Sequence, residues 1–243
     1  MHPKVADMYA RGYCVLEAVY SESECQEIRR LLTEVWQRSG TPPMDGRFGF
    51  VMHPLLEHAP EMAPFYLKKE VLEVLSFVLQ DEVKLAHSGA LTCDETRDFC
   101  DWHYHGNERD EEVTWNTSRS EHLDYFERVL CNVYLDGSND DVGPLVVYPR
   151  ALSAPWGPPS TNRQGDWPGQ EIVHCPPGSA VIFDTALFHS ARPPQREGRR
   201  YLWAATTRAV TIPHPIAKTI TTTAQRWKST KKSTPYFAPN APK

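Results

Sequence analysis

The sequence predicts a mainly β fold, an all-β sandwich or jelly roll with packing α-helices from the N-terminal part of the chain. Two observations favour this class: two helix-like segments come first, and from Val129 onwards short β-favouring runs alternate with turn residues. The chain has 243 residues, of which 40% are hydrophobic, and this suffices for one sizeable core. We therefore expect a single domain over residues 1–220, followed by a basic, partly mobile tail over residues 221–243.

The N-terminal part predicts one strand and two packing helices. The run Tyr13–Val19 predicts a short strand, and Ser21 with Glu24 forms a capping-box pattern that starts a helix directly after it. Gly40 ends this helix. A second helix is predicted over Phe65–Leu79, where leucine and valine occur around much of the circumference, so we expect this helix to be well buried.

The remaining strands are short runs of β-favouring residues bounded by turns. They are predicted at Val83–Thr92, Val129–Leu135, Gly143–Tyr148, Glu171–His174, Ala180–Phe183 and Tyr201–Val210. Two connections are expected beside a site: the polar loop Glu111–Asp124, and the proline- and glycine-rich loop Ala154–Gly169, which is a candidate lid. Three side chains of an irregular earlier stretch are candidates for reaching a pocket: Arg47, Phe48 and Phe50.

Composition argues against several classes of partner. The chain has 31 acidic and 26 basic residues, and its net charge of -5 disfavours nucleic acid or an anionic membrane surface as the main partner. No run reaches transmembrane length and the N-terminus lacks the apolar core of a signal peptide, which predicts a soluble, cytoplasmic protein. The six cysteines form no C-x-x-C pair, so we expect no disulfide framework, and Cys131 is predicted to be a small buried residue.

Three histidines and one arginine form a candidate metal centre. His103 and His105 are two residues apart, so on a strand both imidazoles would face the same side. His189 follows the run Ala180–Phe183 and would complete the set from a neighbouring strand, and Arg200 can hold a carboxylate in a fork. An isolated histidine is more often structural than ligating. Here, however, an H-x-H, a third histidine at a strand end and an arginine at a fixed distance occur together.

Four segments of the chain carry a family resemblance: Trp102-His103, the GPLVVYP segment Gly143–Pro149, the stretch Pro177–Arg200, and the N-terminal strand and helix within Gly12–Trp36. They resemble the phytanoyl-CoA dioxygenase family of iron(II)- and 2-oxoglutarate-dependent oxygenases. The resemblance covers most of Gly12–Val210. It implies a double-stranded β-helix, which is a cupin-like jelly roll, with iron held in its mouth by an H-x-D pair and a distal histidine.

The resemblance also implies roles for individual residues. His103 would be the first iron ligand and His189 the distal one. Arg200, rather than the adjacent Arg199, would pair with the far carboxylate of 2-oxoglutarate, because its spacing from His189 matches the family and only one of two adjacent strand residues points inward. Asn132 falls where the family often lines the co-substrate pocket, although a polar side chain satisfied within its strand is an equally good interpretation. The implied cofactors are Fe(II), 2-oxoglutarate as co-substrate, and O2.

The chain departs from the family pattern where aspartate is expected, because this position holds His105. Three interpretations stay open. His105 ligates and gives a three-histidine site, in which the charge of the iron is less compensated. Alternatively, His105 turns away and leaves a position for a halide, as in related halogenating enzymes, although those have a small residue there. Finally, one of three nearby acids ligates instead: Asp101, Glu108 or Asp110. We favour the first interpretation, since histidine is a competent iron ligand.

The predicted function is an oxygenase that hydroxylates or otherwise oxidises a C–H bond of a small-molecule substrate. One alternative is a three-histidine cupin-type dioxygenase that does not use 2-oxoglutarate, with Arg200 holding a substrate carboxylate. Another is a degenerate, non-catalytic member that binds a ligand. The acids within Glu108–Glu112 hint at a cationic substrate, although a charge run is usually a solvated face. Neither the substrate nor the oligomeric state follows from the sequence.

Overall fold

The structure is a computed structural model and describes residues 3–42, 48–105, 126, 128–151 and 157–209. The chain divides into two compact units, Met1–Val210 and Thr211–Lys243. The second unit contains the predicted tail and lies outside the described residues, so the domain boundary at residue 220 stays a prediction. All the elements named below belong to the first unit.

The N-terminal half supplies most of the helices. The described α-helices are α1 (Pro3–Arg11), α2 (Glu22–Arg38), α3 (Leu55–His58) and α4 (Lys69–Leu79), and two 3-10 helices are η1 (Pro60–Leu67) and η2 (Asp140–Val142). α2 begins as predicted, because Ser21 accepts a hydrogen bond from the backbone of Glu24 and the Glu24 carboxylate accepts one from the backbone of Ser21. A cap of this kind stabilises a helix by about 1 kcal/mol.

The second predicted helix is divided into two. Pro64 lies in η1, which ends at Leu67, and Lys68 is extended before α4 begins. The extended backbone of Lys68 interrupts the helical hydrogen-bond ladder, so α4 starts only at Lys69. The expectation of a well buried helix is wrong on one face, because Phe77 of α4 is 60% exposed.

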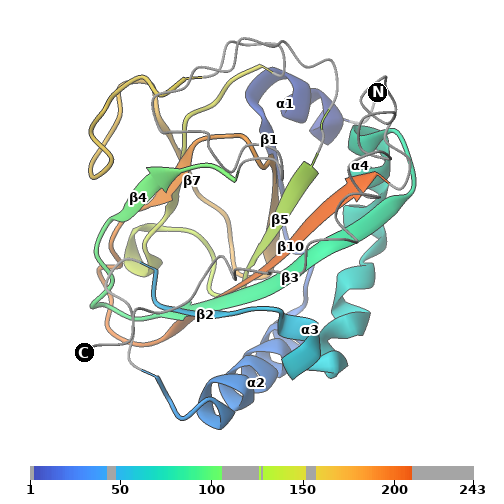
Figure 1. Cartoon of the computed structure of the whole chain (residues 1–243), viewed down its shortest axis with the longest axis vertical. Coiled ribbons are helices and arrows are strands. Elements are labelled where there is room, and N and C mark those ends of the chain that lie inside the picture. The colour runs from blue at the N-terminus through green and yellow to red at the C-terminus, as the bar shows by residue number, and fades with distance from the viewer. Residues whose placement is uncertain (1–2, 43–47, 106–125, 127, 152–156, 210–243) are drawn as a thin grey trace, which may run out of the picture. The chain divides into compact units, whose positions relative to one another are not determined.

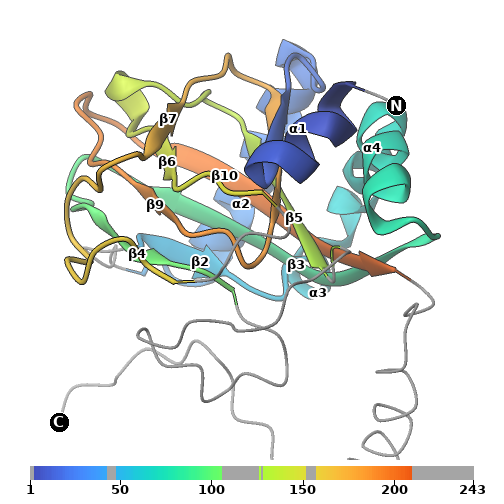
Figure 2. The same ribbon diagram turned by 90° about the horizontal axis from the view of Figure 1, so that it is seen from above.

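Ten strands form two antiparallel sheets in the described part of the chain. They are β1 (Tyr13–Leu16), β2 (Phe50–Met52), β3 (Val83–Cys93), β4 (Cys100–His103), β5 (Arg128–Tyr134), β6 (Leu145–Val147), β7 (Glu171–Val173), β8 (Ser179–Asp184), β9 (His189–Ala191) and β10 (Arg200–Ala209). The larger sheet has the order β1-β8-β5-β10-β3-β2, and the smaller has the order β4-β9-β6-β7 (Figure 1). In the view of Figure 2 the strands of the smaller sheet lie together on the left and α4 lies on the right.

Side chains alternate across the larger sheet and so divide the interior into layers. On its outer face, Cys131, Ile182 and Trp203 belong to the core that the helices cover. On its inner face, Leu130 and Val181 share a second core with the smaller sheet. The two facing sheets are the jelly roll that the sequence predicts. A site between the sheets must therefore be built from side chains on the inner face of each sheet.

The cysteines agree with a further expectation. All six cysteines are free and buried, Cys131 among them. None of the helices that the structure describes has both the length and the apolarity needed to cross a bilayer.

Candidate metal centre

The two sheet-borne histidines are positioned by strand alternation. On β4, Trp102 points to an outer core while the next residue, His103, points between the sheets. At the start of β9, the same alternation places Phe188, which directly precedes the strand, outside and His189 inside. The two histidines are direct partners in the β4–β9 register, so their imidazoles lie side by side, with ring centroids 4.2 Å apart.

His105 reaches the same place by a different route. We expected a strand to hold both His103 and His105. β4 ends at His103, so this expectation is wrong for His105. Its backbone N–H instead donates a hydrogen bond of 2.7 Å to the carbonyl oxygen of Thr185, directly after β8. This bond turns the chain toward the larger sheet and leaves the His105 ring 5.3 Å from that of His103 and 5.1 Å from that of His189.

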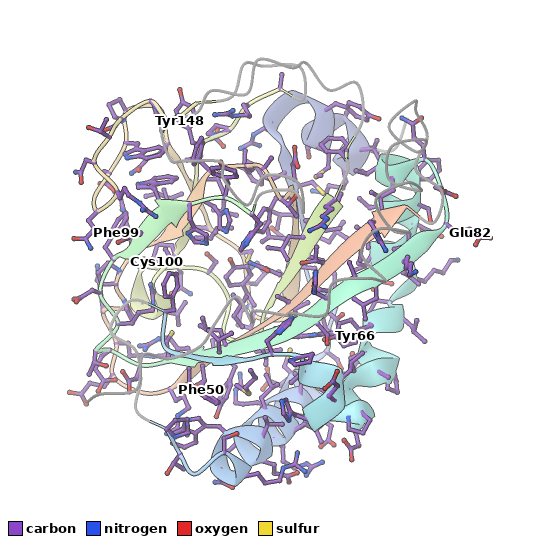
Figure 3. All side chains as sticks on the ribbon, viewed as in Figure 1. Phe50, Tyr66, Glu82, Phe99, Cys100 and Tyr148 are labelled. Carbon is purple, nitrogen blue, oxygen red and sulfur yellow. The ribbon has the colours of Figure 1, made fainter. Side chains whose placement is uncertain are left out.

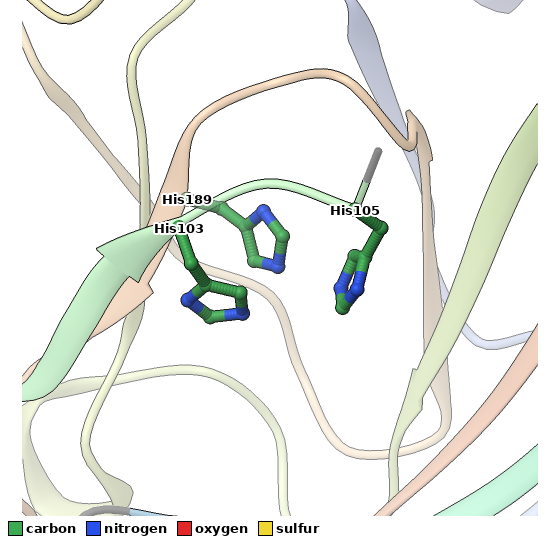
Figure 4. Close-up of side chains that lie close together, drawn as sticks. All are labelled: His103, His105 and His189. Carbon is green, nitrogen blue, oxygen red and sulfur yellow. The ribbon is translucent and has the colours of Figure 1, made fainter. Parts of the chain in front are cut away.

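The three imidazoles converge on one point, as Figure 4 shows. One nitrogen from each ring lies within 4.8 Å of the others. His189 is buried, His103 is half-buried and His105 is exposed, so the group opens to solvent on the side of His105. This spacing fits a single shared metal ion after small side-chain rotations, and imidazole nitrogen is a suitable ligand for iron.

Backbone carbonyls fix the tautomer of two of the rings. Nδ1 of His103 lies 2.7 Å from the carbonyl oxygen of Asp101, and Nδ1 of His189 lies 2.9 Å from that of Leu187. A carbonyl oxygen can only accept, so each Nδ1 carries the proton and each Nε2 presents its lone pair. A hydrogen bond of this kind orients a metal-ligating histidine.

Burial keeps the same two rings neutral. It is the largest cause that lowers the pKa of His103 and of His189, and the neighbouring imidazoles lower the pKa of His189 further. A neutral ring can bind a metal without first losing a proton. The rings of His103 and His189 are therefore in the protonation state that metal binding requires.

No carboxylate joins the three histidines, as far as the described residues extend. A carboxylate oxygen of Asp101 accepts a hydrogen bond of 3.0 Å from the Gln164 side chain instead. The other two acids considered as ligands, Glu108 and Asp110, lie outside the described residues, as do the acidic run to Glu112 and the whole loop Glu111–Asp124.

The two adjacent arginines point in opposite directions. Arg199 is exposed and its guanidinium stacks 3.6 Å from the ring centroid of Trp36 on α2. Arg200 is only 4% exposed and donates hydrogen bonds to the carbonyl oxygens of Gly198 and Asp141. Its Nε atom is buried and has no hydrogen-bond partner among the described residues. Burial lowers the pKa of Arg200, but a guanidinium stays charged at neutral pH.

Asn132 lies between the sheets. It is directly opposite Ala204, which packs in the inner core, and it is 6% exposed. Its Oδ1 atom has no hydrogen-bond partner within the described chain, which leaves an acceptor available inside the barrel. The sequence did not single out Tyr134, two residues further on the same face, where burial raises the pKa of the phenol and the neighbouring Asn132 side chain partly offsets this rise.

Aromatic side chains form the surroundings of the histidines. Phe183 lies with its ring 4.8 Å from that of His189, and Phe48 lies 6.1 Å from His103, so Phe48 is the candidate of that stretch that lies beside the histidines. Phe50 does not, since it packs against the core under the helices (Figure 3). Arg47 lies outside the described residues.

The loop predicted as a candidate lid is packed behind β4 in its described part. Trp167 stacks on Trp102, with ring centroids 4.2 Å apart and planes 10° apart. The backbone and indole N–H groups of Trp102 donate to the carbonyl oxygens of Arg163 and Gly165. These contacts support the strand that carries His103, which is a role that the loop composition did not reveal.

Comparison with known proteins identifies the family. Residues 8–201 match the phytanoyl-CoA dioxygenase family. The chain belongs to this family. The match confirms the family, the oxygenase function and the dependence on iron(II), 2-oxoglutarate and O2 that the sequence motifs predict. No curated protein matches the chain by sequence.

Solved structures confirm the double-stranded β-helix. HygX from Streptomyces hygroscopicus, with nickel and 2-oxoglutarate bound, is 18% identical, with a TM-score of 0.66 and coverage of 87% of this chain and 88% of HygX. EctD from S. alaskensis, with 2-oxoglutarate and 5-hydroxyectoine, is also 18% identical, with a TM-score of 0.65 and coverage of 86% and 76%. SnoK, an alpha-ketoglutarate-dependent carbocyclase from nogalamycin biosynthesis, is 14% identical, with a TM-score of 0.66 and coverage of 86% and 84%.

Proposed function

We propose that this dioxygenase-family enzyme holds its iron(II) through His103, His105 and His189, and that it hydroxylates or otherwise oxidises a C–H bond of a small molecule. The observation that carries the proposal is the convergence of three imidazole nitrogens within 4.8 Å at the point where the two sheets meet. The third imidazole stands where the family pattern has an aspartate.

The residues present fit an iron ion. Two of the rings are neutral, are oriented by backbone carbonyls and present Nε2 to the common point. Three neutral ligands leave the full charge of the metal in place, which favours anionic ligands such as the carboxylate of 2-oxoglutarate. When iron(II), 2-oxoglutarate and O2 are bound, the centre supplies the oxidant that removes hydrogen from the substrate, and 2-oxoglutarate loses CO2.

The protein's part in this chemistry is to hold and orient. Arg200 would bind the far carboxylate of 2-oxoglutarate, with its unpartnered Nε and the remaining N–H groups of its fork available for two parallel hydrogen bonds. Asn132 would line the same pocket, with its free Oδ1 atom facing the barrel interior. Phe183 and Phe48 would form apolar walls that keep the substrate C–H bond near the metal.

A small-molecule substrate is supported by the kind of ligand seen in proteins of the same fold. A HygX structure contains hygromycin B, and the EctD structure contains 5-hydroxyectoine. These ligands differ greatly from one another, so they support the size class of the substrate and not its identity.

Metal analysis combined with 2-oxoglutarate turnover tests the proposal. We expect one iron per chain, a weak visible absorbance when Fe(II) and 2-oxoglutarate are added without O2, and loss of iron binding in His189→Ala. His174→Ala is the matched control, because His174 is exposed and lies beside Asp140 away from the three rings. Iron binding without the absorbance would instead favour a dioxygenase that does not use 2-oxoglutarate. Absence of metal affinity would favour the non-catalytic alternative, and full activity in His189→Ala would refute the ligand assignment.

A further inference from the structure

We infer that the substrate carries an anionic group, a carboxylate or a phosphate, which binds to a row of three cations at the mouth of the barrel. The row consists of Lys84 on β3, Arg208 on β10 and Arg128 on β5, and we call it the cation row. The inference rests on the proposed function, because it takes this mouth as the place where the substrate meets the metal centre.

The strand register places the three side chains in one line. Arg208 is the direct partner of Lys84 in the β10–β3 pair and of Arg128 in the β10–β5 pair. Side chains directly opposite one another in antiparallel strands share a face and lie about 5 Å apart at Cβ. The three cations are 44 to 124 residues apart in sequence and come together only through this register.

The shared face is the inner one. Thr206 of β10 is opposite Leu130, which belongs to the core between the sheets. Thr207 is opposite Val129, which belongs to the core under the helices. Because successive residues of a strand point to opposite faces, Arg208 returns to the inner face with Thr206.

The cation row lies at the same end of the barrel as the three histidines. The carbonyl oxygen of Arg128 accepts a hydrogen bond of 3.3 Å from the backbone of Thr185, and the carbonyl oxygen of Thr185 accepts the bond from His105. From the other side, Phe183 packs against His189 and is the register partner of Leu130, two residues from Arg128. Both routes place the row within a few residues of the metal centre.

The row is separate from the proposed 2-oxoglutarate pocket. Arg200 is the first residue of β10 and Arg208 is the ninth, so about 26 Å of strand separates their backbones. The metal centre lies between the two. Phe183 beside His189 pairs with Leu130, which is opposite Thr206, and Phe48 beside His103 closely precedes Phe50, which pairs with Thr92 opposite Tyr201. 2-Oxoglutarate bound to the metal and to Arg200 would therefore not occupy the cation row, which stays available to a different anion.

Like charges directly opposite one another are unfavourable unless an anion compensates them, and Lys84 and Arg208 are such a pair. Neither Lys84 nor Arg208 forms an ion pair with any residue that the structure describes. The Nε atom of Arg208 is also buried without a hydrogen-bond partner in the same part of the chain. A guanidinium with an unused donor beside two further cations is suited to a carboxylate or a phosphate group.

Two imidazoles extend the basic character of the mouth. His87 on β3 is the register partner of Thr206 and so lies on the inner face, one step deeper than Lys84. Its ring is 5.8 Å from that of His53, which follows β2.

Binding of six matched probes to redox-inert protein tests the inference. The protein is loaded with Zn(II) and saturating 2-oxoglutarate, and dissociation constants are measured by NMR titration for hexyl phosphate, hexanoate, hexanol and hexylamine, with inorganic phosphate and acetate as chain-free references. We expect hexyl phosphate and hexanoate to bind at least tenfold more tightly than hexanol and hexylamine. The amine represents the cationic substrate that the acids within Glu108–Glu112 would favour.

Variants then assign the preference to the cation row. Arg208→Gln is expected to reduce the preference for the anionic probes about tenfold, and Arg208→Lys is expected to keep most of it. Lys84→Gln is also expected to reduce the preference for the anionic probes. Because Lys84 is exposed, this substitution does not alter a buried side chain. Arg30→Gln is the matched control, since Arg30 is an exposed arginine on α2 paired with Glu27 and Glu34.

The outcomes separate the inference from the proposed function. Hexylamine binding as tightly as hexanoate, or an unchanged anion preference in both Arg208→Gln and Lys84→Gln, overturns the inference. Turnover of 2-oxoglutarate by the iron-loaded protein is measured separately and tests the proposed function alone. An anion preference with no metal binding would refute the proposed function while the anion site stands.

Discussion

The backbone N–H of His105 donates a 2.7 Å hydrogen bond to the carbonyl oxygen of Thr185. His103 and His189 belong to the smaller sheet, whereas Thr185 directly follows β8 of the larger sheet. A metal ion held by all three histidines would therefore connect the two sheets. This relationship explains how a residue beyond the end of β4 can still complete the site.

Removal of the third imidazole is expected to weaken iron binding strongly. We predict that His105→Ala lowers the affinity for Fe(II) more than about 100-fold. Removal of a residue that only hydrogen-bonds to a metal ligand costs about 10- to 100-fold, and loss of the ligand itself should cost more. His105→Asp restores the family's ligand type and is expected to retain iron. Metal content after dialysis and the visible absorbance with 2-oxoglutarate give the measurement.

The control for this pair is His58→Ala, at an exposed position on α3 away from the three rings. Wild-type affinity in His105→Ala would mean that two histidines suffice and that His105 is not a ligand. If His105→Asp keeps turnover, His105 is a replaceable ligand. If the same variant keeps iron but loses turnover, the imidazole itself has a specific role in the reaction.

The neighbouring arginines offer a matched test of the co-substrate site. Arg200→Lys removes the planar fork and is expected to raise the KM for 2-oxoglutarate about tenfold or more, because a charge-assisted hydrogen bond contributes about 1.5–3 kcal/mol. Arg199→Lys makes the same chemical change on the opposite face of β10, where Arg199 stacks on Trp36. It is expected to leave the KM unchanged.

Steady-state kinetics with 2-oxoglutarate as the varied substrate distinguishes the two variants. An equal rise in KM for both would point to a general effect on β10 and not to a carboxylate site. A rise for Arg199→Lys alone would reverse the assignment of the two residues.

Local signals were enough to predict most elements and the proximity of His103 and His189. The capping box at Ser21 predicted the start of α2, and the apolar run before Asp184 predicted β8, because each depends on residues that are close in sequence. His103 and His189 followed from strand-end positions in motifs that resemble the family.

Features that depend on distant contacts were not predictable. The stacking of Trp167 on Trp102 joins residues 65 positions apart, so no local pattern indicates it. The cation row depends on the β3–β10–β5 register, which includes a shift between Thr206 and Thr207. α1 was missed because its apolar face is short, with Val5 and Met8 as its buried residues.

The tryptophan pair behind β4 is expected to stabilise both the fold and the metal centre. Trp167 is 2% exposed, so Trp167→Ala should lower the free energy of unfolding by about 3–5 kcal/mol. Because Trp102 adjoins His103, the same change should also weaken iron binding. Urea unfolding and metal titration of the same samples give both quantities.

Trp167→Phe keeps an aromatic ring on Trp102. It is expected to lower the free energy of unfolding and the iron affinity less than Trp167→Ala does. Phe77→Ala is the matched control for deletion of an aromatic side chain, since Phe77 is 60% exposed and should change the stability by less than about 0.5 kcal/mol. A full loss of stability with unchanged iron affinity would show that the pair supports the fold alone.

The cap of α2 predicts how the stability depends on pH. Hydrogen bonds from Lys68 and from the backbone of Ser21 lower the pKa of Glu24 below its ordinary value of 4.5. A carboxyl whose folded pKa is lowered stabilises the protein above its unfolded pKa, and this contribution is lost as the pH falls through the folded pKa. Glu24→Gln is therefore expected to cost up to about 1 kcal/mol at pH 7, given that the pair with Lys68 is partly exposed, and progressively less below pH 4.5.

Urea unfolding of the wild type and of Glu24→Gln from pH 7 down through pH 4 checks this difference. Glu22→Gln is the control, because Glu22 lies in the same first turn of α2 but does not accept a hydrogen bond from the Ser21 backbone. Glu22 interacts with the helix dipole as Glu24 does, but it takes no part in the reciprocal cap with Ser21. If the difference between wild type and Glu24→Gln stays constant over the whole range, the ionisation of Glu24 contributes nothing to the cap, and the cost of the substitution comes from the shape and hydrogen bonding of the side chain alone.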